Sequence, residues 1–376
     1  MNLIKDLSSS ISIIVINFNG RKWLKGCFES LEKLDYPEDS LEIIMGDNAS
    51  SDHSVEWMKQ HFPKVRVVQF DKNYGFCKAN NRCAEQAQGK YLAFLNNDAF
   101  VTPGWLKHLL AAIQSESDIR MAVGKILVPD LEGGRVLNGA GGIFLPTGGI
   151  EDGWMEVDAP AYQTRRYTGF GCGAGILVER DFFISTGGFD EYFFYSCEDI
   201  DLGLRVWLHG YKVVYEPASI MYHYMGGSDK RGLMTSASFV LATRNNLYFL
   251  LKNYQWRTLL KGLFLFHVKL AFSIFRSVIA RKWGVLAAVF QGYRECLGDF
   301  RRILEIRRKS QRKRKIPDSA LYENNLLLGV RESIKRLRMG IRNTERYGWR
   351  TQYAEEDRTT VCFEGNDIFF KSKGMS

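Results

Sequence analysis

Residues 11–20 read ISIIVINFNG, a short apolar run directly before a polar turn. A nearly continuous apolar run predicts a strand that is buried on both faces of a sheet, and asparagine and glycine are typical of turns. The same combination recurs over the next hundred residues. The further apolar runs are 41–46, 65–70, 91–95 and 121–128, and the polar turns are 47–52, 73–76 and 96–98.

Helix-like stretches separate these predicted strands. Their ranges are 21–34, 54–61, 78–88 and 103–115. Strands that alternate with helices predict the α/β class, with a doubly wound, mainly parallel sheet covered on both faces. Such sheets bind ligands beyond the carboxyl ends of their strands, which is where the polar turns lie. Any one turn is explained by turn chemistry alone, whereas four turns on one rim favour a binding site.

The middle of the chain changes character. Residues 133–175 contain twelve glycines, which argues against long helices and for turns or bulged strands. Two later apolar runs, 176–178 and 212–215, predict further strands, and Pro217 follows the second.

Charge and cysteine content narrow the classes of protein. Residues 252–350 carry 24 Lys+Arg against 7 Asp+Glu, or +17, so the rest of the chain, whose total is +9, carries −8. A local excess of this size indicates an attachment surface for phosphates rather than a uniformly basic nucleic-acid binder. The seven cysteines contain no CxxC pair, which favours reduced thiols in the cytosol over disulfides or a zinc module. No basic segment followed by a long apolar run opens the chain, so we expect neither a secretory signal nor a signal anchor.

Residues 239–293 combine aromatic and aliphatic residues with basic residues spaced among them. No stretch reaches about 18 apolar residues free of charge, so we do not expect a transmembrane helix. Two interpretations stay open: a helix in a bilayer interface with snorkelling basic side chains, and an ordinary helical domain. The basic run 301–315 suits either a solvated helix or anionic lipid headgroups, and no aromatic platform of a nucleic-acid module accompanies it. Residues 316–350 look helical, and 359–370 suit a hairpin.

Three later motifs complete the pattern: GGFDE at 187–191, EDIDL at 198–202 and HYMGGS at 223–228. With the four turns, and in this order, they resemble the family 2 glycosyltransferases with the GT-A fold, in particular the bacterial members often labelled rhamnosyltransferases. The resemblance covers about residues 11–228. It is specific because it rests on a series of motifs rather than on one, and it does not include the tail beyond about residue 320.

The resemblance implies that the turns form a pocket for a nucleotide. A carboxylate such as Asp47 can accept a hydrogen bond from a pyrimidine imide N–H, and Gly75 has no Cβ to keep a ligand from the backbone. Asn73 is equally explained as a turn residue. The expected nucleotide-binding residues are Asn17, Asn19, Asp47, Asn48, Ser50, Asp52, Asn73, Gly75, Asn80, Asn96 and Asn97.

The resemblance also implies a metal site. Residues 96–98, NND, stand at the Asp-x-Asp motif of the family, and His223 stands at its metal-binding histidine. A divalent cation held by a carboxylate and phosphate oxygens neutralises a leaving diphosphate. We therefore expect Asp98 and His223 to bind Mn²⁺ or Mg²⁺, and imidazole suits Mn²⁺ at least as well. Asn96 replaces one carboxylate of the motif, so we expect metal binding to depend on bound nucleotide.

Asp199 is the expected general base, since Glu198 and Asp199 match the acidic pair of the family. For transfer with inversion, a base must take the proton of the acceptor hydroxyl on the face opposite the leaving diphosphate. The alternative is that Glu198, Asp199 and Asp201 only favour the start of a helix, where Asp201 and Arg205 form an i,i+4 pair. Asp199 can serve both purposes.

The resemblance places a last group of residues between the donor sugar and the acceptor. They are Gly173, Ala174, Gly188, Phe189, Asp190 and Glu198. Cys172 and Cys197 lie near this group but have no partner histidine at a motif spacing, so we interpret them as packing residues.

These features predict an inverting, metal-dependent glycosyltransferase. It would move a sugar, rhamnose or another hexose, from a UDP- or dTDP-linked donor to a hydroxyl of a lipid-linked or polysaccharide acceptor in cell-surface glycan biosynthesis. Two other classes stay open: a nucleotidyltransferase, although 17–20 is not a basic triphosphate loop, and a non-catalytic scaffold subunit, although Asp98 and Asp199 are both present. We expect a cytoplasmic protein that is peripheral on the inner membrane and binds no nucleic acid. The expected domains are a GT-A catalytic domain at 1–238, a basic amphipathic membrane-associating region at 239–320 and a helical tail with a hairpin at 321–376.

Overall fold

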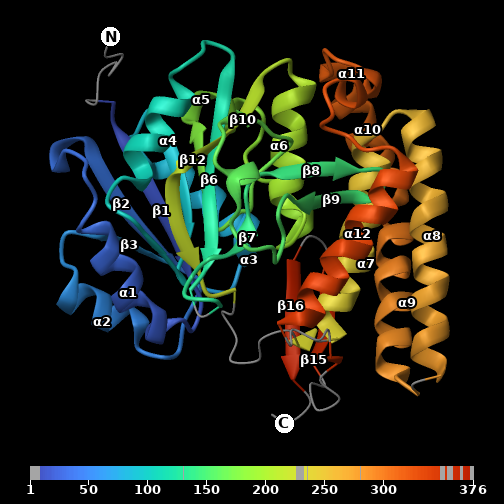
Figure 1. Cartoon of the computed structure of the whole chain (residues 1–376). Coiled ribbons are helices and arrows are strands. Elements are labelled where there is room, and N and C mark those ends of the chain that lie inside the picture. The colour runs from blue at the N-terminus through green and yellow to red at the C-terminus, as the bar shows by residue number, and fades with distance from the viewer. Residues whose placement is uncertain are drawn as a thin grey trace. The chain divides into compact units, whose positions relative to one another are not determined.

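The computed structural model describes residues 9–129, 131–225, 233–234, 236–279, 281–347, 352–353, 359–364 and 367–372 (Figure 1). These residues form two compact units. The first unit lies within Met1–Ile143, Glu151–Glu191 and Glu198–Asp229, and the second lies within Phe144–Ile150, Tyr192–Cys197 and Lys230–Ser376. Two short segments of the amino-terminal half therefore belong to the unit that the carboxyl-terminal half builds. The three-part division predicted from the sequence stays a prediction.

The first unit is built on a mixed sheet with the strand order β10-β12-β6-β11-β4-β1-β2-β3. Strands β1 to β4 are parallel, as predicted, whereas β11 is antiparallel to both β4 and β6. The strands of this path are β1 (Ile11–Asn17), β2 (Leu41–Asp47), β3 (Arg66–Gln69), β4 (Tyr91–Asn96), β6 (Ile119–Val128), β10 (Arg166–Tyr167), β11 (Gly175–Glu179) and β12 (Lys212–His223). Two short strands lie off the path, with β5 (Ala99–Val101) beside β12 and β7 (Val136–Gly139) beside β6.

Helices cover both faces of this sheet, which explains why the strands are apolar throughout. On one face, Ile13 and Val15 of β1 share a core cluster with Phe28 and Leu109. On the other face, the ring centroids of Phe94 and Phe183 are 4.9 Å apart. The helices of this unit are α1 (Arg21–Leu31), α2 (Ser54–His61), α3 (Gly75–Gln86), α4 (Trp105–Ile113), α5 (Arg180–Ser185) and α6 (Glu198–Leu208).

The predicted polar turns meet at one edge of the sheet. Asn17 at the end of β1 is in register with Asp47 at the end of β2, and Ile16 is in register with Asn96 at the end of β4. His223 at the end of β12 pairs with Ala99, next to Asp98. Because the carboxyl ends of parallel strands share an edge, turns that are far apart in the sequence become neighbours.

Strand β12 is longer than the sequence predicted. The expected strand stopped before Pro217, but β12 continues to His223 beside β6. A register shift between Glu216 and Ile220 accommodates the proline, which has no N–H for the ladder. This continuation is what carries His223 to the edge that holds Asp98.

The glycine-rich region folds as predicted, into short strands and turns. Strands β8 (Gly142–Leu145) and β9 (Gly148–Glu151) form a two-stranded sheet. The backbone at Gly141 and Gly148 has positive φ, of 79° and 133°, a conformation that glycine adopts without strain.

The second unit is mainly helical. Its helices are α7 (Ser236–Asn253), α8 (Trp256–Ile279), α9 (Trp283–Gly298), α10 (Phe300–Lys313), α11 (Asp318–Glu323) and α12 (Val330–Arg346). Val240 and Leu241 of α7 are buried in one cluster with Ala288 of α9. The predicted terminal hairpin is confirmed as β15 (Thr359–Glu364) and β16 (Asp367–Ser372), while its turn at 365–366 lies outside the described residues. Two further short strands, β13 (Leu233–Met234) and β14 (Gln352–Tyr353), pair in parallel.

Helix α8 bears on the expectation about membrane spans. Among the described helices, it is the one long and apolar enough to cross a bilayer, judged by length and composition only. Length and composition alone do not show that a helix spans a membrane, so the expectation of no transmembrane helix stays a prediction. Most residues in the apolar stretch of α8 are not buried within the protein.

Candidate active site

Asn17, Asp47 and Ser50 form a closed hydrogen-bond cluster where β1 and β2 end. The Asn17 amide donates to Asp47 Oδ1 at 3.0 Å and to Ser50 Oγ at 3.1 Å. Ser50 in turn donates to Asp47 from its hydroxyl at 2.6 Å and from its backbone N–H at 2.9 Å. Asn17 and Asp47 are buried. The Asp47 carboxylate thus has its orientation set by three donors, as a recognition group requires.

The outer part of this turn is more accessible. Asn19 Oδ1 accepts the backbone N–H of Ser51 at 2.8 Å, and Asp52 Oδ2 accepts the N–H of Arg21 at 2.8 Å. Both bonds tie the turn after β1 to the turn after β2. Asn19 has a positive φ of 50°, which asparagine tolerates better than most residues.

Gly20 allows these turns to pack closely. A Cβ built at Gly20 would lie 2.1 Å from Asn97 Nδ2 and 2.5 Å from Asn17 Oδ1. These two atoms form a hydrogen bond of 2.8 Å, which joins the turn after β4 to the turn after β1. Any side chain at position 20 would break this bond.

The third turn is fixed by Asn48 and Asn73. Asn48 donates to the Gly75 carbonyl at 3.1 Å and accepts the N–H of Tyr74 at 3.2 Å, while Asn73 Oδ1 accepts the N–H of Gly75 at 2.8 Å. Asn80 is buried, and its amide donates to the Phe76 carbonyl one helical turn earlier. The structure therefore brings the predicted nucleotide residues together at one edge, where several of them hold the turns in shape.

Asp98, Asn96 and His223 form the predicted metal cluster. His223 Nε2 lies 3.2 Å from Asp98 Oδ1 and 3.3 Å from Asn96 Nδ2. The other ring nitrogen, Nδ1, lies 2.7 Å from Asn138 Oδ1. An amide oxygen only accepts, so Nδ1 carries a proton, and the Nε2 lone pair can accept from Asn96 Nδ2 or, together with an Asp98 oxygen, bind a cation. The motif residues 226–228 that follow His223 lie outside the described residues.

This arrangement fits a divalent cation. Ligands about 2.1 Å from one ion and at right angles to each other lie about 3.0 Å apart, close to the 3.2 Å between Asp98 Oδ1 and His223 Nε2. Metal-ligating histidines donate their other N–H to an oxygen acceptor, as His223 does to Asn138. Asn138 was not predicted from the sequence, because nothing in the glycine-rich region distinguishes it from a turn residue.

Asp199 lies in the first turn of helix α6, beside the glycine-rich segment. Its Oδ2 accepts the N–H of Gly173 at 3.0 Å, and its Oδ1 accepts the N–H of Ile200 at 2.8 Å. Burial raises the pKa of the Asp199 carboxyl above its usual value, while these two hydrogen bonds oppose the shift. A carboxylate held by the backbone and with a raised pKa suits general-base catalysis.

Glu151 lies beside Asp199 and was missed as a member of the site, whereas Cys172 was expected nearby as a packing residue. Glu151 and Cys172 each place a side-chain atom within 4.8 Å of an Asp199 oxygen. Glu151 Oε2 is buried and accepts no hydrogen bond, and burial raises the pKa of this carboxyl well above its usual value, with Asp199 and Asp152 adding to the shift. Burial likewise raises the pKa of the Cys172 thiol, so the predicted packing role of Cys172 stands. The sequence offered no motif around Glu151.

The alternative interpretation, in which the acidic residues only favour the start of helix α6, applies to Asp201. Asp201 is fully buried and accepts a hydrogen bond of 2.8 Å from Arg205 Nε, which confirms the predicted i,i+4 pair. Arg205 further donates to the Gly188 carbonyl at 2.6 Å. Asp201 thus stabilises the structure around α6, while Asp199 is turned to Gly173.

The remaining predicted residues separate into two groups. Gly173 and Ala174 lie at the edge, since the Ala174 carbonyl accepts the N–H of Asn96 at 3.1 Å. Phe189 is fully buried among the rings of Phe94 and Phe183, at 4.8 and 5.2 Å, so it lies in the core rather than on a surface that a sugar can reach. The expected sugar contacts of Asp190 and Glu198 stay predictions.

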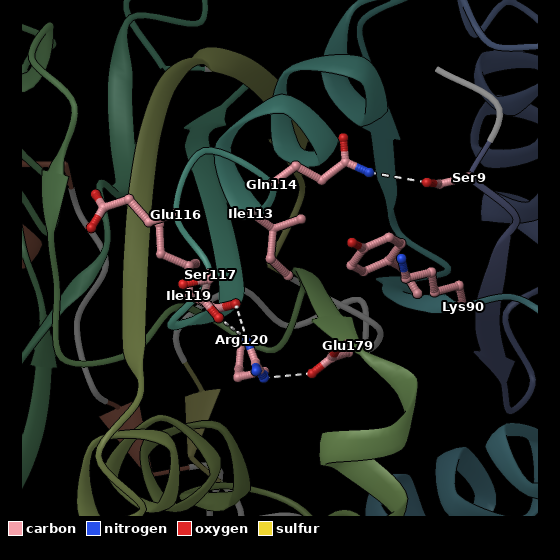
Figure 2. Close-up of a pocket in the computed structure, with 10 residues that line it drawn as sticks. Ser9, Lys90, Ile113, Gln114, Glu116, Ser117, Ile119, Arg120 and Glu179 are labelled. Carbon is pink, nitrogen blue, oxygen red and sulfur yellow. Dashed lines mark hydrogen bonds and ion pairs between the residues drawn. The ribbon is translucent and has the colours of Figure 1, made fainter. Parts of the chain in front are cut away.

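A cavity of about 410 Å³ lies elsewhere in the first unit (Figure 2). Its lining includes Lys90 before β4, Ile119 at the start of β6 and Glu179 at the end of antiparallel β11. These residues lie at the edge of the sheet opposite to the edge that carries the polar turns. Arg120 and Glu179 form an ion pair of 2.5 Å in this lining, as Figure 2 shows. The cavity is separate from the candidate active site.

Known proteins resemble this chain in sequence. Residues 12–136 match the family model described as Glycosyl transferase family 2. The O-antigen biosynthesis protein RfbC of Myxococcus xanthus is 28% identical over 244 residues, which cover 62% of this chain but only 18% of that protein. The N-acetylglucosaminyl-diphospho-decaprenol L-rhamnosyltransferase of Mycobacterium tuberculosis is 27% identical over 253 residues, which cover 60% of this chain and 80% of that protein.

Residues 12–136 are therefore similar to glycosyl transferase family 2, and the match covers this part of the chain only. Among solved structures, a mannosyltransferase from Pyrobaculum calidifontis in complex with GDP-Man and Mn²⁺ has a TM-score of 0.50 at 13% identity, covering 77% of this chain and 88% of that one. At this identity the likeness concerns the fold alone. The predicted GT-A fold, followed by a helical carboxyl-terminal region, is confirmed.

Proposed function

We propose that this chain is an inverting, metal-dependent glycosyltransferase that uses a nucleotide-diphosphate sugar. The observation that carries the proposal is the joint placement of Asp98 and His223, 3.2 Å apart, and of Asp199, held by the Gly173 N–H, at one edge of the sheet. Asn96 links the two groups, because its side chain contacts His223 and its backbone contacts Ala174.

In this proposal Asp199 is the general base. The acceptor hydroxyl oxygen forms a bond to the anomeric carbon while the bond from that carbon to the diphosphate oxygen breaks. The diphosphate leaves with the bonding electron pair, and the hydroxyl proton goes to Asp199. The raised pKa of Asp199 makes it a stronger base than an ordinary aspartate, and the N–H groups of Gly173 and Ile200 hold its oxygens in place.

Asp98 and His223 would hold the cation, Mn²⁺ or Mg²⁺. The bound ion would neutralise the negative charge that develops on the leaving diphosphate. His223 contributes a neutral imidazole nitrogen in the tautomer set by Asn138. The Mn²⁺ in the mannosyltransferase complex of the same fold supports this assignment.

The relatives support a donor and an acceptor class. The mycobacterial relative is named as a rhamnosyltransferase that acts on a diphospho-decaprenol-linked sugar, and the Myxococcus relative as an O-antigen biosynthesis protein. We infer that the donor is a UDP- or dTDP-linked hexose or deoxyhexose. The acceptor is a hydroxyl of a lipid-linked or polysaccharide glycan at the cytoplasmic face of the inner membrane.

The experiment that tests the proposal combines a donor screen with one variant. Nucleotide sugars are screened for acceptor-dependent release of UDP, dTDP or GDP, first with and then without a chelator. Asp199→Asn should lower kcat by at least about 100-fold while the Kd for the free nucleotide stays unchanged, because Asp199 is not part of the predicted nucleotide pocket. Asp181→Asn, on an aspartate whose side chain is 94% exposed on α5, is the matched control.

Four outcomes would contradict parts of this proposal. Wild-type turnover in Asp199→Asn would contradict the assignment of Asp199 as the general base. Activity unchanged by the chelator would contradict the dependence on a cation. Release of diphosphate from nucleoside triphosphates in place of sugar transfer would favour a nucleotidyltransferase. Nucleotide binding without any turnover would favour the scaffold subunit.

We further propose that α8 and α9 lie in a bilayer interface. Large apolar side chains recur along the exposed side of α8 at intervals of about four residues, so they share one face. The exposed residues of this α8–α9 apolar face are Trp256, Leu260, Phe264, Val268, Phe272, Phe275 and Ile279 on α8, and Trp283, Phe290 and Leu297 on α9. A soluble protein rarely leaves so large a continuous apolar surface uncovered.

Charge complementarity supports a bilayer as the occupant of this face. Arg281 and Lys282 connect the two helices, and exposed tryptophans stand at the starts of both, at 256 and 283. Tryptophan prefers the level of lipid headgroups, and basic side chains bind anionic headgroups. Extraction of membranes with alkaline carbonate tests this interfacial placement. Release of the protein is the expected result, and retention in the pellet would instead show that α8 spans the bilayer.

A further inference from the structure

The segment Tyr192–Cys197 is held by one buried asparagine of helix α7. The Asn245 amide donates to three backbone carbonyls, those of Phe193 at 2.9 Å, Tyr195 at 2.9 Å and Ser196 at 3.0 Å. Asn245 is fully buried. Its only side-chain donor group is therefore used entirely on this segment, and it lies where water cannot replace it.

Arg244 completes the contact from the neighbouring position on α7. Its guanidinium donates to Asn245 Oδ1 from Nε at 3.1 Å and from Nη2 at 3.0 Å, and it also donates to the Tyr192 carbonyl. The same guanidinium lies 4.6 Å from the centre of the Tyr192 ring. Two charge-assisted bonds to one amide oxygen fix the Asn245 side chain in the rotamer that points its N–H groups at the segment.

The held segment has an uncommon backbone conformation. Phe194, Ser196 and Cys197 have positive φ values of 64°, 71° and 77°. Residues other than glycine seldom adopt this region, and they persist there only when the surroundings supply compensating contacts. The Asn245 bonds to the carbonyls of residues 193, 195 and 196 supply such contacts around each of these positions.

The segment continues without a break into the acidic pair. Cys197 is followed by Glu198 and Asp199 in the chain, so the backbone conformation at 196–197 sets the direction in which the chain enters α6. A change of φ at Cys197 would rotate everything that follows. A misplacement of about 1 Å at a reacting group can reduce turnover on the order of 100-fold.

We propose that Asn245 is a positioning residue for Asp199 that acts through the backbone of residues 193–197. Helix α7, which belongs to the helical unit, then also contributes to catalysis. The proposal rests on the proposed function for the identity of Asp199 as the base. The clamp itself, defined as the Asn245 and Arg244 bonds to residues 192–196, is independent of that function.

Asn246, the next residue of α7, provides a matched control. It is an asparagine of the same helix, but its amide donates at 2.7 Å to the Ala242 carbonyl within α7 itself. Asn245→Ala and Asn246→Ala therefore each remove one side-chain amide. The amide of Asn245 donates to the segment 193–196, whereas that of Asn246 donates to its own helix. Both variants are made in the full-length chain and compared with the wild type.

The first measurement does not need activity. Hydrogen–deuterium exchange is followed by mass spectrometry for peptides that cover 190–200 and for peptides from strands β1 and β4. We expect Asn245→Ala to speed exchange at least about tenfold in 193–199 and to leave the strand peptides unchanged, since local opening raises exchange only where structure is lost. Asn246→Ala should match the wild type. Unchanged exchange at 193–199 in Asn245→Ala would overturn the clamp.

The second measurement separates positioning from general damage. In Asn245→Ala, kcat should fall on the order of 10- to 100-fold, while the Kd for the free nucleotide and the donor KM stay within about threefold because the predicted nucleotide pocket is built from other segments. A wild-type kcat in a variant with fast exchange at 193–199 would overturn the positioning role. An equal loss of nucleotide binding and kcat would also overturn it, because that pattern indicates general unfolding.

A milder variant covers failure to fold. Asn245→Ser keeps one hydroxyl donor at the position, so it should show intermediate exchange and an intermediate kcat. If Asn245→Ala does not fold, wild-type exchange and wild-type kcat in Asn245→Ser would overturn the proposal. If the wild type transfers no sugar from any donor, the proposed function fails, and the exchange measurement still decides on the clamp.

Discussion

Glu151 is the residue with the most direct consequence for pH dependence. Its carboxyl is buried close to that of Asp199, and Asp152 and Cys172 also lie nearby. Two carboxyl groups in such a place do not both ionise readily, so one of them keeps its proton at pH values where an exposed carboxyl has lost its own. Asp199 accepts two backbone N–H bonds, whereas Glu151 Oε2 accepts none. The proton therefore resides on Glu151, and Asp199 carries the charge.

Replacing Glu151 by glutamine should change how stability depends on pH. The folded-state pKa of Glu151 lies above the value in the unfolded chain. Between these two pKa values, the folded wild type holds a proton that the unfolded chain has lost. Its free energy of unfolding therefore falls as pH rises, by up to about 1.4 kcal/mol per pH unit. Glutamine mimics the protonated acid and has no such loss, so Glu151→Gln should gain stability relative to the wild type from pH 5 to pH 8, measured by denaturant unfolding.

Glu156→Gln provides the comparison for this measurement. Glu156 lies in the same glycine-rich region, where its carboxylate accepts a hydrogen bond of 2.6 Å from the Tyr162 hydroxyl. Parallel stability curves for Glu151→Gln and the wild type across pH 5 to 8 would show that Glu151 is ionised in the folded protein.

At the scale of elements, helices α7 and α9 approach each other through a glycine. A Cβ built at Gly292 would lie 2.5 Å from the Val240 carbonyl oxygen and 2.9 Å from Thr243 Cβ. The first of these atoms belongs to the backbone and cannot move aside without shifting the helix. Gly292 thus sets the distance between α9 and the helix that carries Asn245.

Gly292→Ala should therefore destabilise the helical unit. We expect a loss of about 1–3 kcal/mol, because overpacking costs more than the helix propensity that alanine adds. Gly298→Ala is the control, since a Cβ at Gly298, the last residue of α9, meets no atom within 4 Å. Chemical denaturation of the two variants measures the difference. A Gly292→Ala protein as stable as the wild type would show that α9 can shift away from α7.

At the scale of the whole molecule, charge is segregated along the chain. Residues 252–350 carry +17, while the total is +9. The proposed attraction between this region and anionic lipids would be screened by salt, since the Debye length falls from about 10 Å at 0.1 M to about 3 Å at 1 M. The proposed burial of the α8–α9 apolar face in lipid would not be screened in this way.

Vesicle binding should separate the two contributions. Sedimentation with vesicles of phosphatidylglycerol and phosphatidylcholine should show strong binding in 0.05 M salt and weaker binding in 0.5 M salt. Phe264→Ser/Phe272→Ser, which removes two rings that are 68% and 62% exposed, should weaken binding at both salt concentrations. Binding that is equal for neutral and anionic vesicles would contradict the electrostatic part, and wild-type binding by the double variant would contradict the apolar part.

The sequence by itself determined the parallel strands β1 to β4 of the first unit and the position of most of the polar residues at their carboxyl ends. Apolar strands and polar turns are local patterns, and the parallel arrangement then brings Asn17, Asp47 and Asn96 to one edge without further information. The match of residues 12–136 to a known family follows from the same patterns. Asp201 and Arg205 were predictable for a similar reason, because an i,i+4 pair is a property of one helix.

Only the tertiary structure placed Asn138 behind His223, Glu151 beside Asp199 and Asn245 against the carbonyls of 193–196. Each of these contacts joins residues that are about 50 to 85 positions apart, through a side chain in a segment with no motif of its own. Hydrogen bonds and burial act between atoms that are close in space, and the sequence does not record that closeness when the chain reaches it through irregular turns or through a separate helical unit.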